Sequence, residues 1–313
     1  MKALSVKING VNIAPGSSHR LAIAIARLPS QTLIDLPIYV YRAKKPGPHI
    51  LLTAGIHGDE INGVASLRQL IAEKALLPDC GMVVAIPLVN VYGFIQNSRY
   101  LPDGKDLNRS FPGGKTGSLA RQIAHILMTE VIPVVDFGID FHTGGNQLSN
   151  YPHVRAMLSE TSNKDLSLAM GAPFVANSEF IDKSFRKEAW KKGRNILVFE
   201  GGESQRIDPL TVAEGTQCVK RLMQHLGMKS FNLPVRQSVV LTDLTWLRAK
   251  ISGVFLNKVS LGESVVKGQV IGEVVDPYGE TTWQIKSTQK GYLIGINHAA
   301  VVNAGDALYH IGI

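Results

Sequence analysis

"HILLTAGIHGDE", residues 49–60, is the part of the sequence from which the architecture can be inferred. Its first half is a continuous apolar run, typical of a strand that is buried on both faces. Its second half places His57 and Glu60, with Gly58 between them, where that strand reaches the surface. The next residues, "INGVASLRQLIAEKAL" (61–76), have the period of an amphipathic helix. The polar turn is therefore either a solvated loop or a pair of side chains aimed at a metal ion.

Strands and helices alternate over most of the remaining chain. Buried-strand patterns occur at residues 81–90, 134–145 and 195–203, strand-like composition at 21–28 and 36–43, and helical periods at 118–133 and 211–228, with Gly227 as the C-cap of the last helix. This alternation predicts an α/β fold with a central mixed, mainly parallel sheet flanked by helices.

After "NLPVRQ" (232–237) the alternation stops, and residues 238–313 are rich in Val, Gly and Ile with frequent turns. This segment has a weak internal repeat, because "GVF" before "VVKGQVI" is echoed by "GYL" before "VVNAGDAL". A chain of 313 residues is also long enough for two domains. We therefore expect a catalytic domain at 1–234 and a small all-β, barrel-like domain at 235–313.

Composition excludes several classes of protein. The chain is 45% hydrophobic and 19% charged, and it contains no apolar run long enough to span a membrane. Residues 1–20 lack the pattern of a secretory signal, and the two cysteines, Cys80 and Cys218, are too few for a disulfide framework. We expect a cytoplasmic enzyme with no membrane partner, and the sequence leaves open whether it forms a homo-oligomer.

The net charge of +8 raises the question of nucleic acid. The basic residues are spread along the chain except for "KSFRKEAWKKGR" (183–194), and no nucleic-acid motif accompanies that cluster. We interpret the cluster as a solvated helix face and expect no nucleic-acid partner. A basic balance also suits an enzyme that attracts anionic substrates.

Three predicted strands end in polar, glycine-rich turns: "HGDE" (57–60), "DFHTGG" (140–145) and "FEGGE" (199–203). The carboxyl ends of strands are where ligands bind in open α/β sheets, and the turns supply His57 with Glu60, His142, and Glu200. Two imidazoles and one carboxylate are the ligands of a catalytic zinc, and a further carboxylate can take a proton from water. Each turn alone is more typical of a solvated loop or a structural histidine, but their coincidence favours a metal site.

A fourth segment, "NSRYLPDGKDLNRSFPGG" (97–114), is a polar loop rich in Pro and Gly. Arg109 offers a planar fork for a substrate carboxylate, and Asn108 can bind its other lone pairs. Arg99 offers a positive charge to a polarised carbonyl oxygen. The alternative is a structural loop in which Asp106 and Arg109 pair with each other.

These four motifs, in this order, resemble the succinylglutamate desuccinylase/aspartoacylase family, a branch of the zinc carboxypeptidase fold. The resemblance covers about residues 45–230. It implies one Zn²⁺ per chain on His57, Glu60 and His142, with Glu200 as general base and acid.

The resemblance also implies that Asn108 and Arg109 bind the substrate carboxylate and that Arg99 polarises the scissile carbonyl. Glu203, on the same predicted strand end, is the rival of Glu200 for the role of the base. His153 and Arg155, in "YPHVR", are expected in an exposed loop.

The expected function is hydrolysis of an N-acyl amino acid, a small-molecule substrate, by a metal-activated water. The alternatives are a zinc carboxypeptidase or cell-wall peptide amidase, and a binding protein that has lost catalysis. The acyl group stays open because its pocket is expected among residues 146–195. The tail is similar to a biotinyl/lipoyl-type barrel, but Lys286 lies between Ile285 and Ser287, so the carrier motif is absent and the tail is expected to be structural or an active-site wall.

Overall fold

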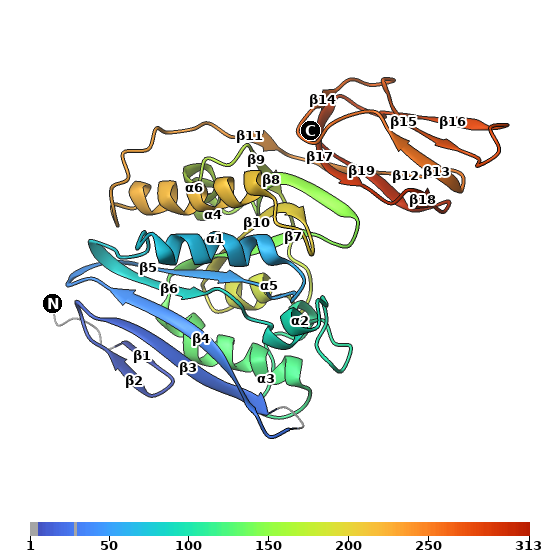
Figure 1. The fold of residues 1–313 in the computed structure, drawn as a ribbon. Coiled ribbons are helices and arrows are strands. Elements are labelled where there is room, and N and C mark those ends of the chain that lie inside the picture. Colours follow the sequence, from blue (N-terminus) through green and yellow to red (C-terminus); the bar gives the residue numbers. More distant parts are fainter. Residues whose placement is uncertain (1–5, 28–29) are drawn as a thin grey trace.

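The structure, a computed structural model, describes residues 6–27 and 30–313 (Figure 1). Parts of two predicted segments, residues 1–5 of the N-terminal stretch and Leu28 of the strand at 21–28, lie outside the described residues. The helices are α1 (Ile61–Ala72), α2 (Val91–Ile95), α3 (Leu119–Ile126), α4 (Thr161–Ala169), α5 (Phe185–Trp190) and α6 (Pro209–His225). The strands of the first half are β1 (Val6–Ile8), β2 (Val11–Ile13), β3 (Ser18–Arg27), β4 (Leu33–Arg42), β5 (Lys45–Ala54), β6 (Cys80–Ile86), β7 (Phe137–Gly144) and β8 (Leu148–Ala156).

The remaining strands are β9 (Phe174–Asn177), β10 (Asn195–Glu203), β11 (Val239–Leu241), β12 (Leu244–Arg248), β13 (Gly253–Asn257), β14 (Ser264–Val265), β15 (Val270–Val275), β16 (Thr282–Lys286), β17 (Gly291–Asn297), β18 (Val301–Val302) and β19 (Ala307–Gly312). All strands and helices predicted from the apolar patterns are present among the described residues. The predicted helix at 118–133 is regular only as α3 and continues as a π-helical turn (Leu127–Val131) and a 3₁₀ turn (Ile132–Val134).

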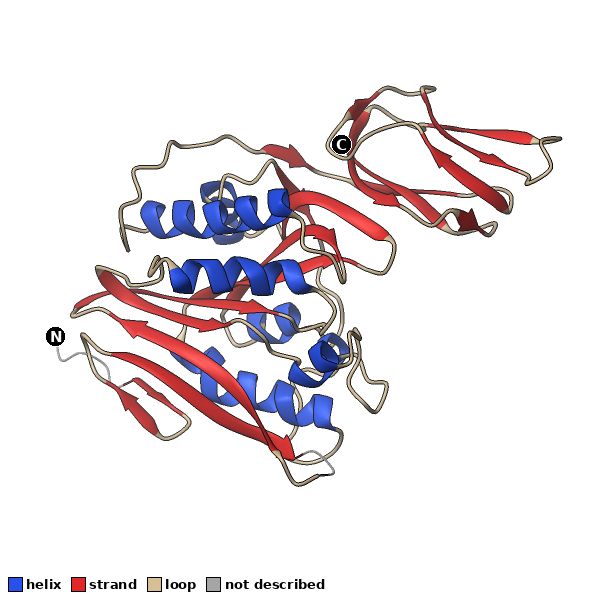
Figure 2. Ribbon diagram, viewed as in Figure 1, coloured by secondary structure: helices blue, strands red, loops and turns tan. Residues whose placement is uncertain are grey.

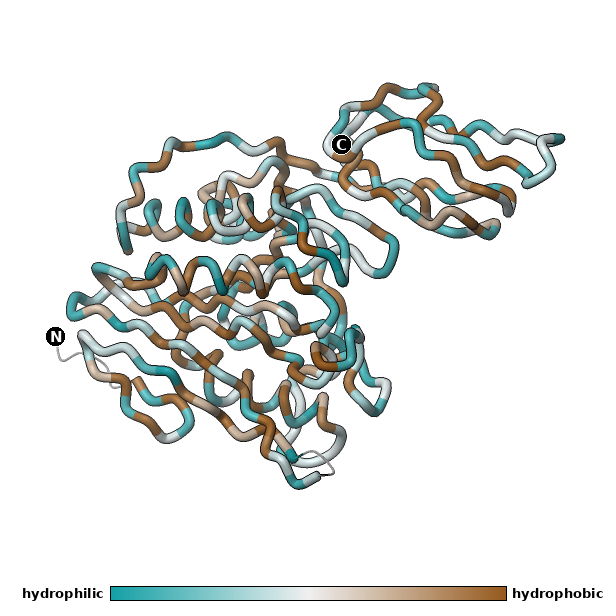
Figure 3. The backbone as a smooth tube through the Cα atoms, in the orientation of Figure 1, coloured by the Kyte–Doolittle hydropathy of each residue, from teal (hydrophilic) through white to brown (hydrophobic). Residues whose placement is uncertain are grey.

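One large sheet has the strand order β12-β19-β17-β8-β10-β7-β5-β6-β4-β3, and helices cover both faces of its central part (Figure 2). On β5, Ile50 and Leu52 join the core under α1 and α6, while Leu51 joins the core under α3 and α5. This explains the continuous apolar run, because successive side chains of a strand point to opposite faces and here both faces are covered. Figure 3 shows apolar residues along these strands and hydrophilic ones in the loops at their ends.

The expectation of a mainly parallel sheet is correct only for its centre. The strands β6, β5, β7 and β10 are parallel neighbours, whereas β4 is antiparallel to β6 and β8 is antiparallel to β10. The reason lies in the connections. Residues 145–147 join β7 to β8, and so short a link reverses the chain, whereas a parallel strand needs a long crossover.

The C-terminal strands do not form an isolated barrel. Strands β17, β19 and β12 extend the central sheet, because β17 is antiparallel to β8, and a separate four-stranded sheet has the order β16-β15-β13-β18. These strands enclose a hydrophobic core of their own, formed by buried residues between Leu247 and Ile311. The small β unit of the prediction is thus present but joined to the main sheet, and a domain boundary at 234/235 stays a prediction. Among the described helices, none combines the length and apolarity of a transmembrane segment.

The predicted helix ends are visible in α6. The Asp208 side chain accepts a hydrogen bond from the Leu210 amide at its N-terminus, and Pro209 is the first helical residue. Gly227 follows the C-terminus with a φ of 65°, a conformation that glycine adopts without strain.

Candidate metal and substrate site

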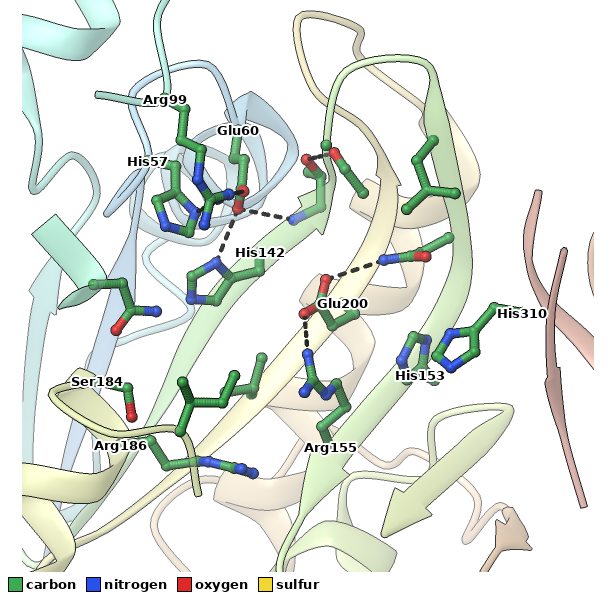
Figure 4. Close-up of a pocket in the computed structure, with 18 of the residues that line it drawn as sticks. His57, Glu60, Arg99, His142, His153, Arg155, Ser184, Arg186, Glu200 and His310 are labelled. Atoms are coloured by element: carbon green, nitrogen blue, oxygen red, sulfur yellow. Dashed lines mark hydrogen bonds and ion pairs between the residues drawn. The ribbon is translucent and has the colours of Figure 1, made fainter. Parts of the chain in front are cut away.

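The carboxyl ends of β5, β7 and β10 meet at one edge of the sheet, where they border a cavity of about 430 Å³ (Figure 4). Its walls include each residue to which the sequence assigned a catalytic, substrate-binding or metal-binding role: His57, Glu60, Arg99, Asn108, Arg109, His142 and Glu200. The sequence motifs, separated by up to 143 positions, therefore converge on one small-molecule-sized space.

The turn after β5 depends on two glycines for different reasons. Gly55 has a φ of +62°. Gly58 does not have a positive φ, but a Cβ there would lie 2.0 Å from the carbonyl carbon of Gly93. Gly58 is thus required by the close approach of the α2 backbone rather than by its own backbone conformation. The turn places His57 and Glu60 at the start of α1.

His57, Glu60 and His142 form a buried cluster. The Nδ1 atom of His57 lies 2.6 Å from Glu60 Oε1, and the Nδ1 atom of His142 lies 2.9 Å from Glu60 Oε2. One ligand atom from each of the three residues lies within 4.8 Å of the others. Two imidazole nitrogens and a carboxylate that converge in this way are the donor set of a four-coordinate zinc site that keeps a position open.

A carboxylate lies behind each imidazole. His142 Nε2 is 2.8 Å from Asp140 Oδ2, and Asp140 in turn accepts a hydrogen bond of 2.7 Å from Thr53 Oγ1. His57 Nε2 is buried, 3.3 Å from Asp106 Oδ1. Carboxylates in this position fix the imidazole tautomer with the proton on Nε2, which leaves Nδ1 as the ligand atom. The arrangement therefore fits a divalent cation, both in the three potential ligands and in the Asp106 and Asp140 carboxylates that orient the two imidazoles.

The pKa shifts of the cluster residues also fit a bound cation. Burial opposes protonation of His142, but the Asp140 and Glu60 carboxylates outweigh it and hold its pKa well above the ordinary range. Burial likewise favours the neutral acid at Glu60, but His57 and His142 outweigh it and lower the pKa of Glu60. Glu60 is thus an ionised carboxylate between two imidazoles, an environment in which a divalent cation is favourable.

Arg99 lies beside this cluster. Its Nη1 is 3.3 Å from Glu60 Oε1, and its Nη2 donates to Asp106 Oδ2 at 3.0 Å. Asp106 therefore pairs with Arg99, and the alternative of an Asp106–Arg109 pair is wrong. The guanidinium is held close to the proposed ligands with about a third of its side chain exposed (32%), so one side faces the cavity.

Asn108 and Arg109 lie on a short 3₁₀ turn, Leu107–Arg109, that begins where Asp106 Oδ1 accepts the Asn108 amide at 2.8 Å. Asn108 Oδ1 accepts a hydrogen bond from the Phe185 amide, which ties the loop to α5. That leaves the Nδ2 hydrogens of Asn108 as donors. Arg109 is exposed at the cavity, where its Nη1 donates to the Asn108 carbonyl at 2.7 Å.

The two candidate bases differ in what they face. Glu200 lines the cavity and accepts hydrogen bonds from Asn150 Nδ2 (3.1 Å) and Arg155 Nη1 (3.0 Å). Glu203 is not part of the cavity wall, and its oxygens accept from the Gln147 amide and from Ser149 Oγ. Glu203 stabilises the turn between β7 and β8, which favours Glu200 for the chemical role.

The structure corrects the expectation for His153 and Arg155. Both lie on β8 and line the cavity, and His153 is only 2% exposed, so "YPHVR" is not an exposed loop. In the sheet, His153 is the register partner of Glu200. The spacing of two between His153 and Arg155 was the available signal, because it places both on one face of a strand.

The basic cluster at 183–194 is a solvated face only in part, because Lys183, Lys191 and Lys192 are exposed while most of α5 is buried. Phe185 and Ala189 of α5 are fully buried in the core, which turns Arg186 inward, where it is 7% exposed and lines the cavity. No local sequence pattern indicates this burial, because the surrounding lysines conceal the apolar positions.

The C-terminal strands supply the last wall. Trp246 of β12 and His310 of β19 stack with ring centroids 4.1 Å apart and planes 3° from parallel, and both border the cavity. Burial, and then the positive neighbours His153 and Arg155, lower the pKa of His310 to about 3, so its ring is neutral near pH 7. Of the two roles expected for the tail, a structural unit or an active-site wall, this position at the cavity favours the wall.

Comparisons with known proteins place this site in a family. Residues 46–226 match the family model of the succinylglutamate desuccinylase/aspartoacylase catalytic domain. A relative from Halomonas elongata, named N-alpha-acetyl-L-2,4-diaminobutyric acid deacetylase, is 27% identical over 290 residues, which are 88% of this chain and 84% of that protein. The product-bound structure of the ectoine utilization protein EutE (DoeB) from Ruegeria pomeroyi has a TM-score of 0.83 and 24% identity, and covers 95% of this chain and 94% of its own.

A succinylglutamate desuccinylase/aspartoacylase structure from Rhodobacter sphaeroides has a TM-score of 0.84 at 23% identity, with 98% of each chain covered. At such identities the structural likeness shows the shared fold. The family match covers more than half of the chain, over the same region as the four motifs. This chain therefore belongs to the succinylglutamate desuccinylase/aspartoacylase family, as its sequence predicted.

Proposed function

We propose that this protein is a zinc-dependent deacylase that hydrolyses the amide bond of an N-acyl amino acid. One observation carries the proposal: the His57–Glu60–His142 cluster and the Glu200 carboxylate border the same cavity, of about 430 Å³. His57, Glu60 and His142 would hold the ion. When bound, zinc supplies a water of lowered pKa and a Lewis acid for the carbonyl oxygen.

The residues of the chain perform the proton transfers and the orientation. Glu200 accepts a proton from the attacking water and later delivers it to the leaving nitrogen. Asn150 and Arg155 hold its two oxygens in place. Arg99, fixed by Asp106, directs its guanidinium toward the carbonyl oxygen as negative charge develops there.

Asn108 and Arg109 bind the carboxylate of the amino acid. The Nδ2 hydrogens of Asn108 and the guanidinium of Arg109 are adjacent donors on one short turn, a geometry suited to a carboxylate. Binding the carboxylate fixes the distance between the scissile amide and the catalytic groups, which reduces the entropic part of the barrier.

The size and walls of the cavity favour a deacylase over a carboxypeptidase or a cell-wall peptide amidase. Trp246 and His310 of the C-terminal strands border the same cavity as Glu200, where a longer peptide would have to extend. The Halomonas elongata relative is named a deacetylase of an amino acid, which supports a small acylated substrate here. A binding protein without catalysis is disfavoured because a free-standing carboxylate, Glu200, borders the same cavity as the three potential metal ligands.

The test is the metal content of the purified protein together with a screen for amine release from N-acyl amino acids and short peptides. We expect about one zinc per chain and chelator-sensitive release from acyl amino acids only. Release from peptides would instead identify a peptidase. No bound zinc and no activity after zinc addition would contradict the roles of His57, Glu60 and His142, and a Glu60→Gln variant serves as the metal-binding control.

A further inference from the structure

A second cavity, of about 710 Å³, lies among the C-terminal strands and shares no lining residue with the proposed active site. Its lining comes from two stretches of the chain: Leu247, Arg248 and Lys250 in and after β12, and the consecutive residues Thr282–Thr288 in and after β16. We call this cavity the edge groove. Figure 1 shows β16 at the end of the C-terminal strands that lies far from the helices.

Both strands that border the edge groove are edge strands. β12 is the last strand at one end of the large sheet, and β16 is the last strand at one end of the four-stranded sheet. Among residues 6–27 and 30–313, each of them therefore has one side that no other strand pairs with. Such a side carries a row of peptide N–H and C=O groups that can pair with another chain.

The free side of β16 can be assigned residue by residue. At one end of the strand, the Ser287 amide donates to the Gln269 carbonyl at 2.9 Å, and at the other end the Thr281 carbonyl accepts from the Asp276 amide at 3.1 Å. Residues 281 and 287 thus face β15. Because the residues of an antiparallel pair alternate between facing the partner and facing away from it, every second peptide group points outward. These outward groups belong to Thr282, Gln284 and Lys286.

An indole ring of β16 is left partly uncovered at the groove. Trp283 and Ile285 lie on the same face of the strand, because they are two positions apart. Ile285 is 7% exposed and belongs to the core of the C-terminal strands, whereas Trp283 is 42% exposed. The ammonium group of Lys250 lies 5.5 Å from the centroid of the Trp283 ring. An apolar side chain that enters the groove can therefore cover the ring and gain buried area.

The charged residues of the groove are all basic. Arg248, Lys250 and Lys286 are exposed, and the lining contains no Asp or Glu. In the part of the chain that the structure describes, none of the three forms an ion pair. The groove therefore attracts an acidic ligand. A second copy of this chain is a poor occupant, because its net charge is +8 and a lysine on an edge strand opposes pairing between copies.

We propose that the edge groove is a docking site for an extended, acidic segment of a partner protein, which pairs with β16 as a fifth strand of the four-stranded sheet. Main-chain hydrogen bonds to the outward peptide groups supply affinity for any extended polypeptide. Carboxylates of the segment meet the three basic side chains, and an apolar residue between them covers Trp283. The ladder of peptide groups favours a polypeptide over a nucleic acid, which has no backbone N–H to pair with it.

The test uses a short peptide as the probe, acetyl-TEVEVET-amide, in which glutamate alternates with valine. Its matched control is acetyl-TQVQVQT-amide, which has nearly the same shape without the charges. An interface of one added strand is small, so we expect a Kd of about 10–100 µM for the acidic peptide and the full chain by calorimetry. The glutamine peptide should bind about 10-fold more weakly, because several exposed ion pairs are lost.

Variants locate the binding site. Lys286→Glu should weaken binding of the acidic peptide by about 10-fold or more, because repulsion replaces attraction. Trp283→Ala should weaken binding of both peptides, because the apolar contact is lost. Lys164→Glu changes the net charge by the same amount at an exposed position of α4, and should bind as the wild type does. The thermal midpoint reports whether each variant is folded.

Hydrogen exchange separates strand pairing from a simple ionic contact. In the presence of saturating acidic peptide, the amides of Gln284 and Lys286 should exchange about 10-fold more slowly, as measured by NMR, because they become hydrogen-bonded. Binding that leaves the exchange of both amides unchanged would refute the pairing with β16, and with it the proposal.

Other outcomes would also overturn the docking site. They are absence of acidic-peptide binding at about 1 mM, equal binding of the two peptides, and tighter binding of an oligothymidylate than of the acidic peptide. Self-association in sedimentation that is lost in Trp283→Ala would identify a second copy as the occupant instead. None of these measurements involves hydrolysis, so they leave the proposed deacylase untouched, and loss of the deacylase would leave the docking site intact.

Discussion

At the scale of single residues, the two carboxylates at the end of β10 are distinguished by their hydrogen-bond partners. Glu200 faces the cavity, and Glu203 is held by the turn at Gln147 and Ser149. We expect Glu200→Gln to lower kcat by about 10²–10⁴-fold, the usual contribution of a general base, with zinc content unchanged. Glu203→Gln is the matched control and should retain kcat within a few-fold. Steady-state kinetics of both variants check this, and equal losses would show that the role assignment is wrong.

The carboxylate behind His142 leads to a second prediction. Asp140 accepts a hydrogen bond from Thr53 and lies 2.8 Å from His142 Nε2, so it fixes the orientation of that ring. Replacing Asp140 by Asn should weaken zinc binding by about 10–100-fold, because the partner that orients the ligand and raises its basicity is lost. Competition with a chromogenic chelator measures the affinity. Asp165→Asn, at an exposed position on α4, should have the wild-type affinity.

At the scale of elements, the position of α1 against β7 depends on the absence of a side chain. A Cβ on Gly63 would lie 2.3 Å from the Cβ of Phe141 and 3.0 Å from that of Ala54. Gly63→Ala should therefore lower the free energy of unfolding by about 1–3 kcal/mol, even though alanine is the better helix former, because the helix must move off the sheet. Urea denaturation measures the change. Gly145→Ala, where a Cβ would contact nothing within 4 Å, should have little effect on stability.

The sequence patterns of single elements also show how much of the fold and the candidate site could be predicted. The strands β5, β7 and β10 were predictable because their two buried faces leave continuous apolar runs, and His57, His142 and Glu200 follow from the polar residues at their ends. Arg186 was not predictable, because its burial depends on how Phe185 anchors a short, lysine-rich helix. The wall formed by Trp246 and His310 depends on a pairing between β17 and β8 that no local pattern encodes. The roles of the site residues stay predictions until they are measured.

At the scale of the whole molecule, a half-buried histidine, His310, couples pH to the docking of the C-terminal strands. Burial, and then His153 and Arg155, lower the pKa of His310 from 6.5 to about 3 in the folded state. The unfolded chain therefore takes up a proton below pH 6.5 that the folded chain refuses. The contribution to stability is complete above that pH and declines as pH falls through this range, by at most about 1.4 kcal/mol per pH unit.

His310→Phe keeps a ring against Trp246 but removes this titration. The free energy of unfolding of the variant should fall less steeply than that of the wild type between pH 6.5 and pH 4, as measured by urea denaturation at each pH. Parallel slopes for the two proteins would show that His310 does not titrate as its surroundings indicate.

The order of the strands has a consequence for biosynthesis. A chain leaving the ribosome exposes every proposed ligand and the proposed base long before β17, β19 and β12 are available to pair. Until then the first half of β8, from Leu148 to Asn150, has an open edge, and an unpaired edge invites association with other nascent chains. The strands that border the cavity, β12, β17 and β19, thus also protect the newly synthesised chain from aggregation, although they are the last to be synthesised.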